Sequence, residues 1–253
     1  MTGTSPQPDR IQIAILAYPG MTALDSIGPY DVLRGLPGAE IRFVWHEPGP
    51  ITTDSGVLVL AATHSLDETP APDIVLVGGS IPATMATAAD EKVLAWLRRV
   101  HEHTTWTLSV CSGSLILAAA GLLDGQPATS HWAAQSLLTG LGAKPQRDKR
   151  IVRSGKIVTA AGVSAGIDLG LWLIGEMAGP DRARAVQLAI EYDPQPPYDS
   201  GHPSKATAQT KQAAARLTKD LATSRELGGE FLNGSKVLWS SAIRRARARF
   251  ARV

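Results

Sequence analysis

The stretch TWTLSVCSGSLILAAAGLL, residues 105–123, decides the fold class. Residues 105–110 form a short apolar run of strand length, and residues 114–123 are rich in alanine and leucine, which is typical of a helix. The single cysteine of the chain, Cys111, lies in the turn between them, and a glycine follows two residues later. A potential nucleophile in a sharp strand-to-helix turn is the pattern of a nucleophile elbow in an α/β protein.

The alternation of strands and helices continues on both sides of this stretch. The predicted strands are short apolar or β-rich runs: residues 11–17, 41–46, 53–62, 73–77 and 105–110, followed by a hairpin over residues 151–160. The predicted helices have an apolar stripe or a helix-forming composition: residues 24–33, 90–103, 114–123, 132–141 and 168–177. This alternation predicts a parallel sheet that is covered by helices on both faces, the α/β class.

Length and composition exclude several classes of protein. A chain of 253 residues, 44% hydrophobic and 19% charged, can bury one large core and is not expected to be disordered. No apolar run is long enough to cross a bilayer, and the polar start of the chain has no signal-peptide core. A single cysteine excludes an intramolecular disulfide and a thiolate-rich metal site, so we expect a cytoplasmic protein.

Charge is distributed unevenly along the chain. Residues 1–202 carry 14 basic and 20 acidic side chains, whereas residues 203–253 carry 11 basic and 3 acidic ones. We therefore divide the chain into a flexible N-terminus at 1–10, an α/β domain at 11–203 and a basic helical extension at 204–253. The extension has a basic face suited to nucleic acid, but we favour a helix that docks on the acidic body or on a second subunit. The residues expected to dock share one helical stripe: Trp239, Ile243, Ala246 and Phe250.

The residues that follow the predicted strands are candidate site residues, because ligands bind beyond the carboxyl ends of parallel strands. Asp25 follows the first strand, Gly79 follows the strand at 73–77, and Cys111 follows the strand at 105–110. Together they would provide a proton carrier, an anion-binding backbone and a nucleophile. Each also has a purely structural interpretation: a helix cap for the carboxylate, a tight turn for the glycine and packing for the thiol.

Two neighbours of the elbow complete the candidate site. The first amides of the helix, that of Ser112 among them, would point at the Cys111 sulfur and lower its pKa. His131 follows twenty residues later and either lines the pocket or simply begins a helix with a backbone hydrogen bond. The histidines and carboxylates show no metal-ligand spacing, and the glycine pair lacks a dinucleotide fingerprint, so we expect neither a metal nor another cofactor.

Three segments carry a family resemblance: PGMTALDSIGPYDVL after the first strand, then DIVLVGGS, then SVCSGSLILAAAGLLDGQPATSHWA. They resemble the DJ-1/PfpI superfamily and, within it, the isonitrile hydratases, and the resemblance extends over most of residues 11–203. It implies a flavodoxin-like parallel-sheet sandwich, a homodimer, and the hydration of an isonitrile to an N-substituted formamide. Ser112 departs from the pattern, because such hydratases often have threonine after the nucleophile; it keeps the hydroxyl group.

The resemblance also implies a role for each residue. Cys111, as thiolate, would attack the terminal carbon of the isonitrile and form a covalent thioimidate. Asp25 would carry the protons, and the amides of Gly79 and Ser112 would stabilise the developing charge. His131 would line the pocket without an assigned role.

Two other classes of function remain open. The elbow could serve as a ligand or oxidant sensor, and related regulators join such a domain to a DNA-binding helix-turn-helix pair, for which residues 205–253 are short. Another superfamily activity is the second alternative; Ser112 in place of histidine disfavours a peptidase, and Asp25 in place of glutamate disfavours a glyoxalase or deglycase. We therefore expect a small-molecule partner rather than nucleic acid or a membrane.

Overall fold

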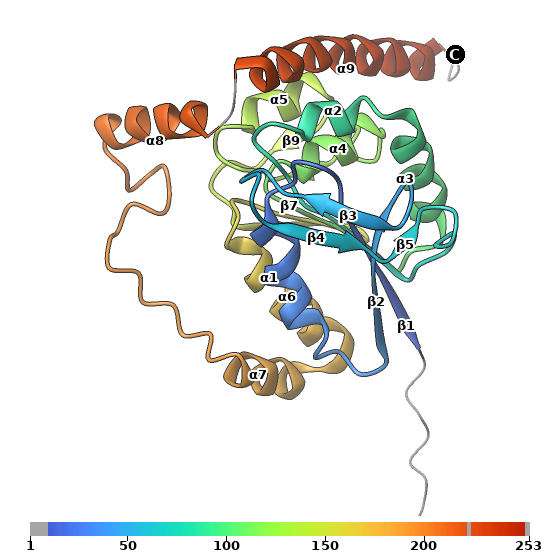
Figure 1. Ribbon diagram of the computed structural model, residues 1–253, viewed down its shortest axis with the longest axis vertical. Coiled ribbons are helices and arrows are strands. Elements are labelled where there is room, and N and C mark those ends of the chain that lie inside the picture. The colour runs from blue at the N-terminus through green and yellow to red at the C-terminus, as the bar shows by residue number, and fades with distance from the viewer. Residues whose placement is uncertain (1–9, 222–223, 251–253) are drawn as a thin grey trace, which may run out of the picture.

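The computed structural model describes residues 10–221 and 224–250 (Figure 1). Its centre is a seven-stranded sheet in the order β10-β11-β7-β6-β1-β2-β5. Every neighbouring pair is parallel except β10 and β11, which form the predicted hairpin. The strands are β1 (Ile11–Leu16), β2 (Ala39–Trp45), β5 (His64–Ser65), β6 (Ile74–Val77), β7 (Trp106–Val110), β10 (Ile151–Ser154) and β11 (Ile157–Ala160). The predicted flexible N-terminus at 1–10 lies almost wholly outside the described residues.

Helices cover both faces of the sheet, as the sequence predicted, and bury two apolar cores. One face is covered by α1 (Ala23–Leu33), α6 (Ala165–Ala178) and α7 (Pro180–Ala189). The other is covered by α2 (Thr84–Ala88), α3 (Glu91–His103), α4 (Gly113–Ala119) and α5 (Gln135–Gly140). The fold is therefore the predicted α/β sandwich.

The predicted helix at 90–103 shows how local chemistry sets an element. The side chain of Asp90 accepts hydrogen bonds from the N–H groups of Lys92 and Val93 at 3.0 and 3.2 Å, which caps the first turn of α3. The apolar residues at helical spacing, Val93, Leu97 and Val100, are buried against the sheet. A polar cap followed by an apolar stripe is visible in the sequence, which explains why this prediction was accurate.

Three predicted elements differ from the structure. The strand predicted at 53–62 is a turn followed by β4 (Val59–Ala62), which pairs with β3 (Gly49–Thr52) in a small hairpin outside the main sheet. The helix predicted at 114–123 ends at Ala119, because Gly121 adopts a left-handed conformation with φ +89°. The helix predicted at 132–141 begins only at Gln135. A short pair, β8 (Pro127–Ala128) and β9 (Lys144–Pro145), lies in this region.

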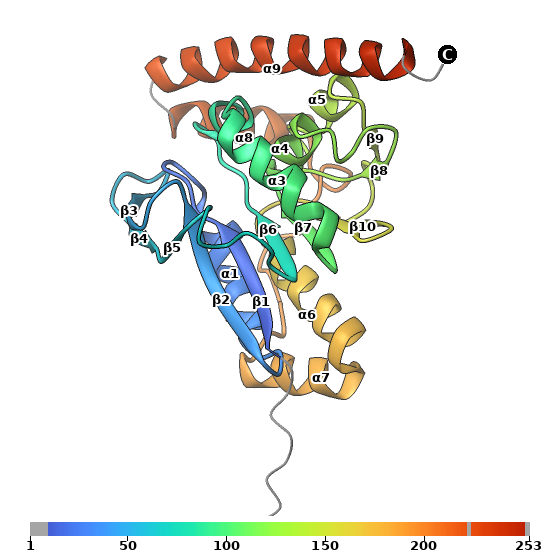
Figure 2. The ribbon, with the colours of Figure 1, turned by 90° about the vertical axis from the view of Figure 1, so that its right-hand side faces the viewer.

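The C-terminal extension contains two helices, α8 (Ala208–Asp220) and α9 (Ser224–Phe250). Figure 1 shows α8 at the side of the body, joined to α7 by a long segment without regular structure. Figure 2 shows α9 lying across the outer end of the layer that contains α3, α4 and α5. No described helix has both the length and the apolar composition that crossing a membrane requires. The division into a body at 11–203 and an extension at 204–253 stays a prediction.

The side of α9 that docks on the body differs from the predicted one. Val237 is 2% exposed, and Arg244 contacts Asp124 at 3.2 Å and the carbonyl of Ala118 at 3.1 Å. In contrast, Trp239 of the predicted stripe is 72% exposed. The stripe therefore does not dock on the body of its own chain, where Val237 and Arg244 make the contact, and docking of the stripe on a second subunit stays a prediction.

Gly113 permits the closest packing in the core. A Cβ atom at this position would overlap the carbonyl oxygen of Val77 and lie 2.8 Å from the carbonyl carbon of Gly78. We expect Gly113→Ala to lower the free energy of unfolding by about 3 kcal/mol, because the neighbouring backbone cannot move aside as a flexible side chain would. Urea denaturation followed by circular dichroism measures this change.

The matched control is Gly228→Ala in α9, where a Cβ atom would meet nothing within 4 Å. Alanine forms helices better than glycine, so this variant should be as stable as the wild type or more stable by up to about 1 kcal/mol. Equal stability of the two variants would contradict the packing argument.

Candidate active site

The carboxyl ends of three adjacent strands meet at one site. Because β6 lies between β7 and β1 in the sheet, the residues that follow these strands come together. The N–H of Gly79 donates to Asp25 Oδ2 at 2.7 Å. A Cβ atom on Gly79 would lie 2.6 Å from the backbone nitrogen of Ser112, so the glycine loop contacts the elbow directly. The structure thus brings together Asp25, Gly79, Cys111 and Ser112.

Cys111 has the backbone conformation of a nucleophile elbow. Its φ is +58°, a left-handed value that is strained for a residue with a side chain. Its N–H donates to the carbonyl oxygen of Ala161 at 2.8 Å, and its own carbonyl accepts from the hydroxyl groups of Ser130 and Ser114 at 3.0 and 3.3 Å. Hydrogen bonds on both sides of the residue hold the strained turn in place.

Asp25 is a fully buried carboxyl group. Burial raises its pKa from 3.8 to about 7, although the hydrogen bond from Gly79 opposes this shift. Oδ1 has no conventional hydrogen-bond partner among the described residues, and the Cys111 thiol provides only a weak sulfur contact that also lowers the pKa. At neutral pH this carboxyl group can therefore both accept and donate a proton.

The Cys111 thiol has a pKa well above its usual value. Burial is the largest cause, since the residue is only 7% exposed, and the negative charge of Asp25 adds to it. The N–H and the hydroxyl of Ser112 lower the pKa, as predicted for the first amides of the helix, but they do not outweigh burial. The sequence does not show the extent of burial, so the net direction of the shift could not be predicted from it.

Thiol and carboxyl must be considered as one coupled pair. A negative charge on Asp25 raises the pKa of the Cys111 thiol, whereas the protonated thiol lowers the pKa of the carboxyl group. The carboxyl group therefore loses its proton first, and the thiol holds its own more tightly. Above about pH 7 the pair carries one negative charge and one proton. Transfer of that proton from sulfur to carboxylate creates the thiolate without adding charge to the site.

The N–H of Gly79 makes a contact that differs from its predicted role, and the Ser112 side chain makes contacts that were not predicted. The hydroxyl of Ser112 contacts the Ser80 backbone at 3.1 Å and the Thr84 hydroxyl at 2.8 Å, so it binds a neighbouring loop. The N–H of Gly79 is already donated to Asp25 and is not free for a substrate. The amide of Ser112, which contacts the Cys111 sulfur, is left as the group that stabilises charge there.

Tyr18 is a site residue that sequence reasoning missed. It is fully buried, and its hydroxyl donates to the carbonyl of Gly78 at 3.0 Å. Burial and the charge of Asp25 raise its pKa, so the phenol stays protonated. Its position two residues after β1, at the same edge of the sheet as the elbow after β7, was the available signal.

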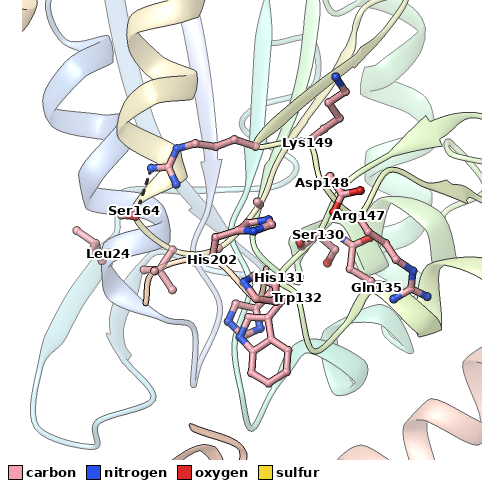
Figure 3. A pocket seen from close by; sticks show the side chains of 16 residues that line it. Leu24, Ser130, His131, Trp132, Gln135, Arg147, Asp148, Lys149, Ser164 and His202 are labelled. Carbon is pink, nitrogen blue, oxygen red and sulfur yellow. Dashed lines mark hydrogen bonds between the residues drawn. The ribbon is translucent and has the colours of Figure 1, made fainter. Parts of the chain in front are cut away.

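A pocket of about 450 Å³ opens beside the nucleophile. Leu24, the neighbour of Asp25, lines it, as does Ala161, whose carbonyl accepts the N–H of Cys111. Figure 3 shows the lining, which comes from residues 130–132, 135, 147–150, 161–164 and 201–203 in addition to Leu24. The pocket therefore adjoins the backbone of Cys111 through Ala161 and Ser130, although neither Cys111 nor Asp25 is among its lining residues.

His131 lines this pocket. Burial lowers the pKa of its imidazole, so the ring is neutral near pH 7. Its Nδ1 also accepts a long, 3.4 Å hydrogen bond from the N–H of Ala133 in the turn before α5. His131 therefore lines the pocket and makes a backbone hydrogen bond, but it lies four residues before Gln135 and does not begin α5, and no described contact gives the ring a catalytic partner.

No metal centre is evident in the described part of the chain, where no three His, Cys, Asp or Glu side chains gather as metal ligands would. The chemistry that the described residues offer is therefore that of a thiol, a carboxyl group and backbone amides.

Comparisons with known proteins agree with this geometry. Residues 11–176 match the profile of the DJ-1/PfpI family. An isonitrile hydratase of Pseudomonas putida is 42% identical over 212 residues, which are 83% of this chain and 92% of the hydratase. A ThiJ/PfpI family protein from Pseudomonas syringae superposes with a TM-score of 0.82 at 35% identity and covers 93% of both chains. The HTH-type transcriptional regulator CdhR of Pseudomonas aeruginosa is 31% identical over 70% of this chain, but over only 53% of the regulator.

The raised pKa of Asp25 predicts a specific dependence of stability on pH. Between about pH 4 and pH 7 the folded protein binds more protons than the unfolded chain, so its stability decreases as the pH rises. Asp25→Asn removes this titration. Relative to wild type, we expect the variant to gain up to about 4 kcal/mol of unfolding free energy between pH 4 and pH 8, measured by urea denaturation at each pH.

The control is Asp31→Asn, which changes a solvent-exposed aspartate on the same helix. Its stability should stay close to that of the wild type, because the side chain is 62% exposed. A pH-independent difference between Asp25→Asn and wild type would contradict the raised pKa.

Proposed function

The chain belongs to the DJ-1/PfpI family, and we propose that within it this protein is an isonitrile hydratase, a lyase that adds water to R–NC and releases the N-substituted formamide. The observation that carries the proposal is the strained elbow cysteine beside a buried carboxyl group with a pKa of about 7. The 42% identity to the Pseudomonas putida hydratase over most of both chains supports the same activity.

Cys111 is the proposed nucleophile. Asp25 takes the thiol proton, the sulfur bonds to the terminal carbon of the isonitrile, and Asp25 delivers that proton to the same carbon, which gives the thioimidate R–N=CH–S. The proton transfer leaves the charge of the buried pair unchanged, so burial does not oppose it. The amide of Ser112 stabilises the sulfur while it carries charge.

Hydrolysis of the thioimidate completes the reaction. Water attacks the thioimidate carbon, and Asp25 moves one proton of the water to the nitrogen. The carbon–sulfur bond then breaks, the second water proton returns to the sulfur, and R–NH–CHO leaves. One carboxyl group serves both steps because its pKa lies near the working pH.

The pocket beside Cys111 is the proposed site for the substituent R. Leu24, Trp132 and Val163 provide apolar surface, and the neutral ring of His131 adds to it. A pocket of about 450 Å³ is large enough for a small alkyl or aryl group, and its other side is lined by the charged residues 147–150.

Two alternative functions have less support. A redox sensor needs an accessible low-pKa thiol, whereas Cys111 is 7% exposed and has a raised pKa. A DNA-binding role for the extension is disfavoured because the side chains of Arg244 and Arg245 already bind carbonyl groups of the body. A glyoxalase- or deglycase-like reaction at the same pair is the remaining enzymatic alternative.

We further propose that the protein acts as a cytoplasmic homodimer. A reducing compartment keeps the Cys111 thiol available, and the exposed Trp239 on α9 is a large apolar side chain for which the described chain provides no cover. Sedimentation equilibrium at micromolar concentration should give twice the mass of one chain; a monomer would contradict the homodimer.

Substituting Cys111 and Asp25 in turn tests the proposed activity. Wild-type protein mixed with a small alkyl or aryl isonitrile should release the formamide, detected by NMR. Cys111→Ala should abolish turnover, and Asp25→Asn should lower kcat by a factor of about 10² to 10⁴, because the proton carrier is lost. Asp31→Asn, the exposed control on the same helix, should retain wild-type rates.

Two results would overturn the proposal. Full turnover by Cys111→Ala would exclude a covalent mechanism on this sulfur. Wild-type protein that hydrates no isonitrile but converts methylglyoxal, or binds duplex DNA in a salt-dependent manner, would favour one of the alternatives.

A further inference from the structure

Helix α9 reaches the region of the elbow through one side chain. Glu230 accepts hydrogen bonds from the N–H groups of Met85 at 2.7 Å and Ala86 at 2.9 Å, both in the first turn of α2. The residue before α2, Ala83, has no side chain that can cap the helix. A carboxylate from another helix, 145 residues away from Met85 in the chain, thus provides the cap.

The start of α2 is joined to the elbow by buried hydroxyl groups. The Thr84 hydroxyl donates to the carbonyl of Ser80 at 2.6 Å and lies 2.8 Å from the hydroxyl of Ser112. The N–H of Ser80 lies 3.1 Å from the same Ser112 oxygen. All three residues are at most 7% exposed, so water does not replace these contacts.

Helix α9 makes a second polar contact with the body at α4, the helix that begins at the elbow. The guanidinium of Arg244 donates to the carbonyl groups of Ala118 and Ala119 at 3.1 and 2.6 Å, at the C-terminal end of α4. The carboxylate on α2 and the guanidinium on α4 each match the charge at the helix end that they contact. Helix α9 therefore connects the two helices between which Ser112 lies.

We infer that Glu230 is a positioning residue for Cys111: through the first turn of α2 and the hydroxyl of Thr84, it holds Ser112 against the sulfur. The C-terminal extension then influences the reactivity of the Cys111 thiol. This inference rests on the proposed function in one respect, namely that Cys111 is the nucleophile; it does not depend on which substrate the protein hydrates.

Alkylation of Cys111 by iodoacetamide tests the inference, because it reports thiolate formation without any isonitrile. We expect Glu230→Ala to lower the alkylation rate at pH 8 by a factor of about 3 to 10 and to move the inflection of the rate–pH profile upward, since Ser112 no longer stabilises the thiolate. Glu230→Gln keeps one acceptor oxygen and should lie between wild type and alanine. In the hydration assay kcat should fall in the same order while KM stays constant.

Arg245→Ala is the control, because Arg245 binds the carbonyl of Gly140 near α5 and does not contact α2. It should alkylate at the wild-type rate. A merely structural role for Glu230 would leave the inflection unchanged, or would speed alkylation by exposing the thiol, and either result would overturn the inference.

The two proposals can fail separately. One outcome is that Glu230→Gln changes the alkylation rate while the wild-type protein hydrates no isonitrile. This outcome would support the positioning role and contradict the hydratase. Normal hydration by Glu230→Gln with an unchanged alkylation profile would contradict the positioning role alone. If Glu230→Ala does not fold, the glutamine variant still decides between these outcomes.

Discussion

The left-handed turn at Cys111 is the constraint on which the rest of the site depends. A cysteine with φ +58° is strained, and the turn closes only because α4 can approach the end of β6 at Gly113, where there is no room for a side chain. The same approach places the Ser112 amide at the sulfur and the Gly79 amide at Asp25. The geometry of both reactive groups therefore follows from one close contact between backbones.

Burial determines the chemistry that this geometry can perform. A thiol and a carboxyl group that are both shielded from water cannot both be charged, so they share one proton over a wide range of pH. In water, Asp25 would be a permanently ionised carboxylate and a poor proton donor. The site thus has an acid with a pKa near neutral because this aspartate is buried, and not because the residue type is unusual.

Features that depend on neighbouring residues could be predicted from the sequence, and features that depend on distant ones could not. The elbow and the strand ends were predictable because Cys111 and Gly113 are adjacent in a recognisable pattern. Helix α2 was missed because its five residues carry no apolar stripe, and its cap, Glu230, is far away in the chain. The raised pKa of Asp25 depends on burial, which only the fold determines.

The long separation between Met85 and Glu230 has a consequence for biosynthesis. While the ribosome is still making the chain between Met85 and Glu230, which lie 145 positions apart, the strands and the elbow can already assemble, but the two amides at the start of α2 have no partner. The turn that carries Cys111 can therefore form before Glu230 caps α2. In a nascent chain the start of α2 is not yet capped. Fusions or truncations within α9 would affect the same late step, the docking of Glu230 on α2.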